Sequence, residues 1–146
     1  MQTNLVQQFA NDPEGQEAEE ILRACVHCGF CTATCPTYQE LNDERDGPRG
    51  RIYLMKGLAD GKIEATASVL DHLDLCLDCQ ACETACPSGV VYHELIEQTR
   101  ERLGQGRDRG AIDRLVQSIF FELFPYPLRL KLSLLPARLL QKMGLW

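Results

Sequence analysis

The sequence lacks several familiar features, and each absence excludes a class of protein. It contains neither a Gly-x-Gly-x-x-Gly nor a Gly-x4-Gly-Lys motif, so we expect no flavin, nicotinamide or ATP site in this chain. No apolar run reaches the roughly 18–20 residues that a membrane-spanning helix needs. The first residues form neither a basic n-region nor an apolar h-region, so nothing directs the chain to an oxidising compartment.

Segments with strand-like alternation are nearly absent, and helical periodicity dominates instead. We therefore predict an all-α fold, with a helical domain followed by a helical C-terminal segment. Five helices are expected: one that begins at Pro13, one from Pro48 to Gly61, one over about 65–75, one from Ser88–Gly89 to Gly104, and one over about 111–124. Two further short helices are expected in 128–140, with a break at Pro136. A polar loop is expected at Gln39–Gly47.

The eight cysteines form two copies of one spacing, and none is left over. The copies are Cys25-x2-Cys28-x2-Cys31-x3-Cys35-Pro36 and Cys76-x2-Cys79-x2-Cys82-x3-Cys86-Pro87. This is the bacterial ferredoxin spacing, which binds [4Fe–4S] clusters through cysteine thiolates. The sequence therefore predicts an α-helical ferredoxin domain with two [4Fe–4S] clusters, and one-electron transfer.

In two-cluster ferredoxins the fourth cysteine of each run ligates the cluster of the other run. We therefore expect a crossed arrangement. The first cluster is assigned to Cys25, Cys28, Cys31 and Cys86, and the second to Cys76, Cys79, Cys82 and Cys35. Such crossed ligands would tie the two halves of the domain together.

Disulfides and zinc sites are the two other common uses of cysteine in a small protein. Disulfides suit an even number of cysteines in a small protein, but the beginning of the chain gives no sign of an oxidising compartment. Zinc is bound by separated Cys-x2-Cys pairs, which do not account for a third cysteine at the next interval or for the Cys-Pro ending. Both alternatives are weaker than the iron–sulfur prediction.

The net charge of −6 conceals an asymmetry between two parts of the chain. Residues 1–100 carry 7 Lys and Arg against 17 Asp and Glu, whereas residues 101–146 carry 8 against 4. The acidic part is a poor partner for nucleic acid. The apolar, basic tail is expected either to pack against another subunit or domain, or to lie on a membrane surface.

We expect two regions: a two-cluster domain over 1–104, with its motifs near 20–40 and 70–90, and a linker and tail over 105–146. Gly104–Gly110 is the expected boundary.

His27 is interpreted either as a donor to a cluster sulfur or as an exposed spacer, and His72 and His93 as ordinary helix residues. Arg49 and Arg51 are interpreted as balancing cluster charge, as holding a partner's carboxylate, or as surface residues.

Three segments closely resemble the iron–sulfur subunit of bacterial glycolate oxidase (glycolate dehydrogenase): 21–38, 46–56 and 72–90. The segment Asp46-Gly-Pro-Arg-Gly-Arg-Ile and the ending Pro87-Ser-Gly-Val are narrower signals than the cysteine runs alone. Members of that family continue into a long C-terminal half with Cys-Cys-Gly segments. This chain resembles the N-terminal ferredoxin part, and its tail resembles the family's linker.

The resemblance implies that the eight cysteines are cluster ligands and that FAD lies on flavoprotein partner subunits. It implies transfer of electrons from glycolate, oxidised to glyoxylate, to a membrane acceptor such as quinone. The chain is then expected to be cytoplasmic or peripheral on the inner face of the cytoplasmic membrane, and inactive alone. Alternatives are the cluster subunit of an anaerobic glycerol-3-phosphate dehydrogenase, of a lactate or heterodisulfide oxidoreductase, a free ferredoxin-like carrier, or a non-redox interaction module.

Overall fold

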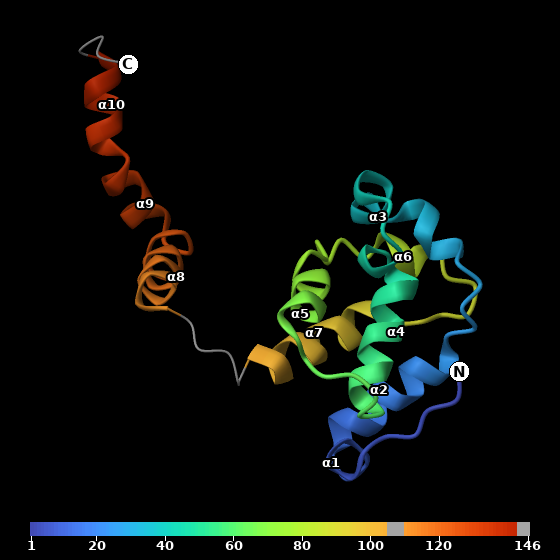
Figure 1. Ribbon diagram of the computed structural model, residues 1–146. Helices are drawn as coiled ribbons and strands as arrows, with labels where there is room; N and C mark the ends of the chain where they lie inside the picture. The colour runs from blue at the N-terminus through green and yellow to red at the C-terminus, as the bar shows by residue number, and fades with distance from the viewer. Residues whose placement is uncertain (105–109, 143–146) are drawn as a thin grey trace. The chain divides into compact units, whose positions relative to one another are not determined.

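The computed structural model describes residues 1–104 and 110–142. The chain divides into two compact units, Met1–Gly106 and Arg107–Trp146, and each is described by itself. Within the described ranges every regular element is helical and no strand occurs, which confirms the predicted all-α fold (Figure 1). The expected linker falls largely on residues 105–109, which lie outside the described residues.

The first unit is built from seven α-helices and two short 3₁₀ helices within its described residues. These are α1 (Gln7–Ala10), α2 (Pro13–Ala24), η1 (Phe30–Thr34), α3 (Pro36–Leu41), η2 (Glu44–Asp46), α4 (Pro48–Ala59), α5 (Ala67–Asp74), α6 (Ala81–Thr84) and α7 (Tyr92–Gly104). The helices predicted to begin at Pro13 and Pro48 do so, because proline suits the first helical position, where its missing N–H costs nothing. The third predicted helix begins two residues late, at Ala67, because the Thr66 side chain caps it by accepting from the Val69 N–H.

Two expectations about local structure were wrong. The helix predicted from Ser88–Gly89 begins only at Tyr92, because Gly89 has a φ of +63° and its N–H bonds to the Cys86 carbonyl in a turn. The predicted polar loop Gln39–Gly47 contains the end of α3 and all of η2. There the Asp43 side chain accepts from the backbone N–H of Arg45 at 2.9 Å and so starts the short helix.

The core of the first unit lies where α7 meets α2, α4 and α5 (Figure 1). Leu22, Leu73, Leu95 and Ile96 are all at most 2% exposed. Burying each such side chain stabilises the fold by roughly 1.5–3 kcal/mol. Cysteines of both motifs belong to this core or pack against it, so the core and the candidate site form one packed region.

The second unit contains α8 (Ala111–Leu123), α9 (Pro127–Ser133) and α10 (Leu135–Lys142). The break expected at Pro136 falls instead at Leu134, and Pro136 lies in the first turn of α10. Large apolar side chains of this unit stay exposed, among them Ile112, Leu115, Phe121, Phe124 and Leu128. Within the described ranges, none of the helices combines the length and the apolar character needed to cross a membrane.

Candidate iron–sulfur sites

The two cysteine motifs follow the same backbone course. Each first cysteine comes just after a helix, α2 before Cys25 and α5 before Cys76. The second and fourth residues after it then have a positive φ: +55° and +86° at His27 and Gly29, and +52° and +57° at Asp78 and Gln80. These left-handed residues coil the chain tightly, and a short helix, η1 or α6, follows in each motif. Gly29 adopts this conformation without steric cost, and His27 and Asp78 belong to residue types that are enriched in it, whereas Gln80 does not.

The first cavity lies between residues of the two cysteine motifs. Four sulfur-bearing residues that line it are Cys25, Cys28 and Cys31 from the first motif and Cys86 from the second, and Cys82 also reaches it. Much of the remaining wall is apolar, formed by Phe30, Ile52, Val90 and others.

The second cavity also lies between residues of the two cysteine motifs. Its sulfur-bearing residues are Cys76, Cys79 and Cys82 from the second motif and Cys35 from the first. The structure therefore brings each motif's fourth cysteine to the cavity of the other motif. Cys82, Pro48 and Tyr92 line both cavities, so the two are immediate neighbours.

All eight cysteines are free thiols in this structure. Burial raises the pKa of Cys82 to about 12. The pKa of Cys31 is also raised, chiefly by burial and further by nearby Cys25, Cys86 and Cys28. A bound metal reverses this preference, because cysteine ligates as the thiolate and releases its proton on binding.

The residues present fit iron–sulfur clusters. Five thiols line the first cavity and four line the second, so each offers an all-sulfur donor set, the soft set that suits iron–sulfur clusters. Across the described ranges, His, Cys, Asp and Glu side chains form no group of three or more suited to a single metal ion.

Hydroxyl groups approach two sulfurs of the second cavity. The Tyr92 hydroxyl donates to Cys76 Sγ at 3.7 Å, and Thr37 Oγ1 lies 3.2 Å from Cys35 Sγ. Tyr92 is 4% exposed, and burial raises its pKa well above the usual value. Tyr92 is 16 positions from Cys76, so no local spacing points to its hydroxyl. Thr37 is only two positions from Cys35, and that proximity in sequence could have indicated the contact.

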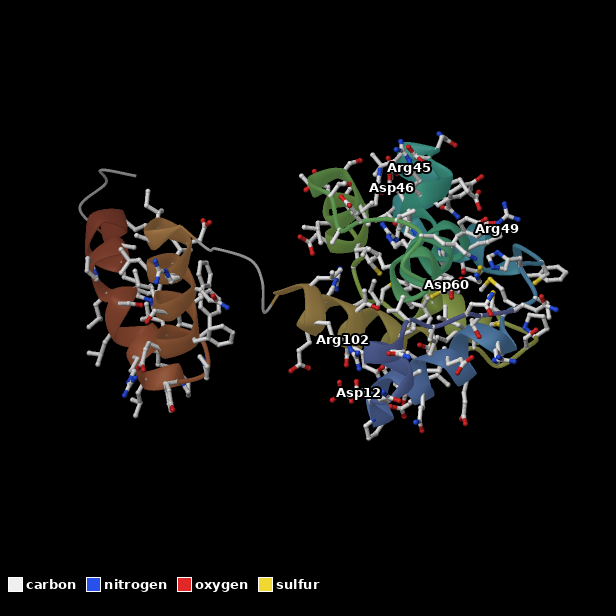
Figure 2. All side chains as sticks on the ribbon, turned by 60° about the horizontal axis from the view of Figure 1, so that its bottom comes forward. Asp12, Arg45, Asp46, Arg49, Asp60 and Arg102 are labelled. Atoms are coloured by element: carbon white, nitrogen blue, oxygen red, sulfur yellow. The ribbon has the colours of Figure 1, made fainter. Side chains whose placement is uncertain are left out.

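The other residues singled out from the sequence take distinct places. His27 lines the first cavity, and its Nε2 lies 2.9 Å from Met1 Sδ, with burial lowering its pKa. His93 Nδ1 lies 2.8 Å from Glu83 Oε1, a contact that raises the pKa of His93. Arg49 lines the first cavity and Arg51 the second. Figure 2 labels Arg49 in the first turn of α4 and Arg45 and Asp46 in η2, the short helix that precedes α4.

Comparisons with known proteins match both the cysteine-rich part and the tail of the chain. Residues 21–90 match the model of the 4Fe-4S dicluster domain, and residues 112–146 match that of the glycolate oxidase iron-sulfur subunit, linker region. The glycolate oxidase iron-sulfur subunit of Escherichia coli is 50% identical over 127 residues, covering 87% of this chain and 31% of that protein. The probable counterpart in Bacillus subtilis is 41% identical over 142 residues, covering 96% and 32%.

A more distant relative is lactate utilization protein B of Bacillus licheniformis, which is 30% identical over 114 residues, or 73% of this chain and 22% of that protein. No solved structure matches the chain. The chain spans about a third of the length of the two glycolate oxidase relatives.

Two thiol-lined cavities in a helical fold, within a matched dicluster domain, define an iron–sulfur protein of the dicluster ferredoxin type. The match continues through the linker region that is particular to one family. The chain belongs to the family of glycolate oxidase iron–sulfur subunits.

Proposed function

We propose that this chain is the electron-transfer part of a glycolate oxidase. Glycolate is oxidised to glyoxylate at FAD on partner flavoprotein subunits, and electrons pass through two [4Fe–4S] clusters of this chain to a membrane acceptor such as quinone. The observation that carries the proposal is the pair of neighbouring cavities, each lined by cysteines of both motifs. The chain itself contributes no hydroxyacid catalyst.

The proposed ligands are crossed between the motifs. Cys25, Cys28, Cys31 and Cys86 hold the first cluster, and Cys35, Cys76, Cys79 and Cys82 hold the second. The cavity linings support this assignment. The shared wall at Cys82 and Tyr92 supports transfer between two clusters that lie close together.

When bound, the clusters supply one-electron chemistry, and the residues of this chain shape access to them. Cys28 and Cys79 are the two exposed cysteines, one in each motif. Exposed apolar side chains lie beside them in the sequence, Val26 and Phe30 in the first motif and Leu77 in the second, each 67% exposed. Such surface is suited to docking a redox partner. We propose that electrons enter and leave at these two exposed edges.

The test begins with metal content. Anaerobic reconstitution should give about eight iron and eight sulfide per chain. Stoichiometric zinc, or half the iron, would defeat the two-cluster proposal. The reconstituted chain alone should not be reduced by glycolate. With the flavoprotein subunits added, glycolate should bleach the cluster absorbance.

The relationship to lactate utilization protein B favours lactate as a second candidate electron donor. Lactate and glycerol 3-phosphate should therefore be offered in the same assay. Reduction by lactate but not by glycolate would replace the proposed substrate and leave the electron-transfer role intact. Reduction by none of the donors, with all clusters present, would favour a free carrier.

A further inference from the structure

Arg51 is a buried cation with an incomplete set of partners. It lies on α4 and is 1% exposed. Its Nε donates to the backbone oxygen of His72 at 2.6 Å, and its Nη1 donates to Thr37 Oγ1 at 3.1 Å. Its Nη2 is buried without a hydrogen-bond partner, and Asp46 Oδ1 lies 3.8 Å from it. A buried N–H of a charged group left unpaired is costly, so this atom points to a missing acceptor.

The side chain lies where such an acceptor belongs. Arg51 lines the second cavity, together with Cys35, Cys76, Cys79 and Cys82. Among the described residues, Asp46 and His72 do not line that cavity. The positive charge is therefore closer to the cavity than the carboxylate that balances it.

The residues around Arg51 fix its position. His72 Nδ1 lies 2.8 Å from Asp46 Oδ1, and the Thr37 hydroxyl donates to the backbone oxygen of Asp46 at 2.7 Å. Asp46 is itself 4% exposed. The guanidinium is thus held by α3, η2 and α5 at once, and a planar fork held in this way loses little freedom when it donates to one more acceptor.

We propose that Arg51 donates through Nη2 to a cysteine or cluster sulfur of the second cluster and favours its reduced form. The inference rests on the proposed function. Reduction adds one negative charge to the cluster. A fixed cation and a hydrogen bond to sulfur stabilise that charge and raise the reduction potential. Arg51 is in this sense a tuning residue, and it transfers no electron itself.

Two other charged residues provide matched comparisons. Arg49 lines the first cavity, but its side chain is 36% exposed and its Nε donates to Glu44 Oε1 at 2.5 Å. Its charge is therefore both paired and screened by water. Asp78 lines the second cavity, and its Oδ1 is buried without a hydrogen-bond partner. Its formal charge is opposite to that of Arg51, so its removal should have the opposite effect on the same cluster.

The experiment is a redox titration of the reconstituted full chain, followed by cluster absorbance and electron paramagnetic resonance. Iron and sulfide content is measured for every variant. The titration should show two one-electron steps, one for each cluster. Arg51→Met should lower the midpoint potential of one of them by at least 59 mV, which corresponds to a tenfold change in the reduction equilibrium constant. Asp78→Asn should raise the midpoint potential of that same step, and Arg49→Met should leave it unchanged. Arg51→Lys should have a potential close to that of the unmodified chain, because lysine keeps the positive charge.

Arg51→Met leaves the buried Asp46 carboxylate without its cation, so it can fail to fold. The double variant Arg51→Met with Asp46→Asn removes both charges and is then titrated in its place. The inference is judged on whichever of these two variants retains about eight irons. It is overturned if that variant leaves the midpoint potentials of both steps unchanged. It is also overturned if the variant shifts only the potential that Asp78→Asn does not change. Loss of clusters from the unmodified chain would instead overturn the proposed function.

Discussion

The guanidinium of Arg100 holds the backbone of Cys76. Its Nη2 donates to the carbonyl oxygens of Cys76 at 2.6 Å, Leu73 at 2.8 Å and Asp74 at 3.1 Å. Arg100 lies on α7, so this helix caps the C-terminus of α5 where the second motif begins. At the first motif the amino group of Met1 takes the equivalent place, donating to the carbonyls of Arg23 and Cys25. In both motifs a cation caps the helix that precedes the first cysteine.

Arg100→Ala should weaken the second cluster site selectively. It leaves three carbonyls without their charged donor, and hydrogen bonds to charged groups contribute about 1.5–3 kcal/mol each. We expect about half of the iron to be released faster to a chelator, with the other half released at the original rate. Arg102→Ala is the control, because Arg102 lies on the same helix but pairs with Asp12 and Glu14 at the start of α2, and Figure 2 shows it beside Asp12. Equal loss from both sites would contradict the prediction.

The features of this fold that the sequence predicts are those that depend on residue types and spacing within one segment. Pro13 and Pro48 mark helix starts, and the apolar spacing Ile52, Met55 and Ala59 places one face of α4 in the core. The helix type and the candidate ligands follow from such local patterns. The start of α7 at Tyr92 does not, because Gly89 adopts a left-handed turn that is compatible with either a loop or a helix end.

The surroundings of the sulfurs depend on contacts distant in sequence. Arg51 and His72 are 21 positions apart, and Arg100 and Cys76 are 24 apart. Nothing in either local sequence distinguishes Arg51, which is buried, from Arg49, which is partly exposed. A helix start with two arginines permits both assignments, and only the packing of η2 and α5 against α4 decides which one is enclosed.

The crossed ligation can be tested by counting iron in double variants. If Cys35 and Cys76 serve one cluster, the chain with Cys35→Ala and Cys76→Ala loses that cluster only and keeps about four irons. The chain with Cys35→Ala and Cys28→Ala then loses a ligand from each cluster and keeps almost none. Double variants with Cys86→Ala should give the mirror result. Cys86→Ala with Cys28→Ala should lose only one cluster, whereas Cys86→Ala with Cys76→Ala should lose both. Uncrossed sites would exchange these outcomes.

Gly50 is required by a close backbone approach. A Cβ at this position would lie 1.9 Å from the backbone oxygen of Glu44, where α4 packs on η2. Gly50→Ala must therefore push η2 away, and overpacking of this kind costs about 1–3 kcal/mol or more. We expect a lower thermal unfolding midpoint and weaker retention of the second cluster, because η2 supports Thr37 and Cys35 through the carbonyl of Asp46.

The matched control is Gly104→Ala at the end of α7, where no atom lies within 4 Å of the added Cβ. That variant should be neutral or slightly stabilising, since alanine restricts the unfolded chain. A Gly50→Ala protein as stable as the Gly104→Ala protein would show that η2 can move freely.

Asp60 should make attachment of the N-terminal segment sensitive to acid. Its side chain is fully buried and accepts from the backbone N–H of Asn4 at 2.9 Å and from the ammonium groups of Lys56 and Lys62. Burial alone would raise its pKa, but these hydrogen bonds prevail and lower it from the ordinary 3.8 to about 2. Because this pKa is lowered in the folded chain, the ionised Asp60 carboxylate stabilises the folded state above pH 3.8, and this stabilisation is lost as the pH falls through about 2. Protection of residues 1–6 from pepsin should therefore decline over this window.

Asp60→Asn should be less protected at pH 4–5 and should lose the acid dependence of that segment. Asp71→Asn, an exposed change on α5, is the control and should behave like the unmodified chain. An unchanged acid profile in the Asp60 variant would assign the sensitivity to another group.

The helices α8 to α10 should serve association and not cluster binding. All eight cysteines lie within Met1–Gly106, which forms a compact unit by itself. The second unit exposes Ile112, Phe120 and Phe124, and the last two rings stack at 5.0 Å on an otherwise uncovered face. Contiguous exposed apolar surface of this kind marks an interaction site. A chain of residues 1–110 should retain about eight irons yet bind the flavoprotein subunits at least tenfold more weakly.

A full-length chain with Phe120→Ser and Phe124→Ser separates the face from the length of the tail. Both rings lie on α8 or at its end, and their replacement should reproduce most of the loss in a binding titration against the flavoprotein subunits. Arg129→Gln is the control, because that side chain only joins Glu122 and covers the Tyr126 ring at the exposed surface. Unchanged partner affinity for both the truncated chain and the phenylalanine variant would remove the tail from the subunit interface. Co-sedimentation with anionic lipid vesicles would then decide whether its basic, apolar helices bind a membrane surface instead.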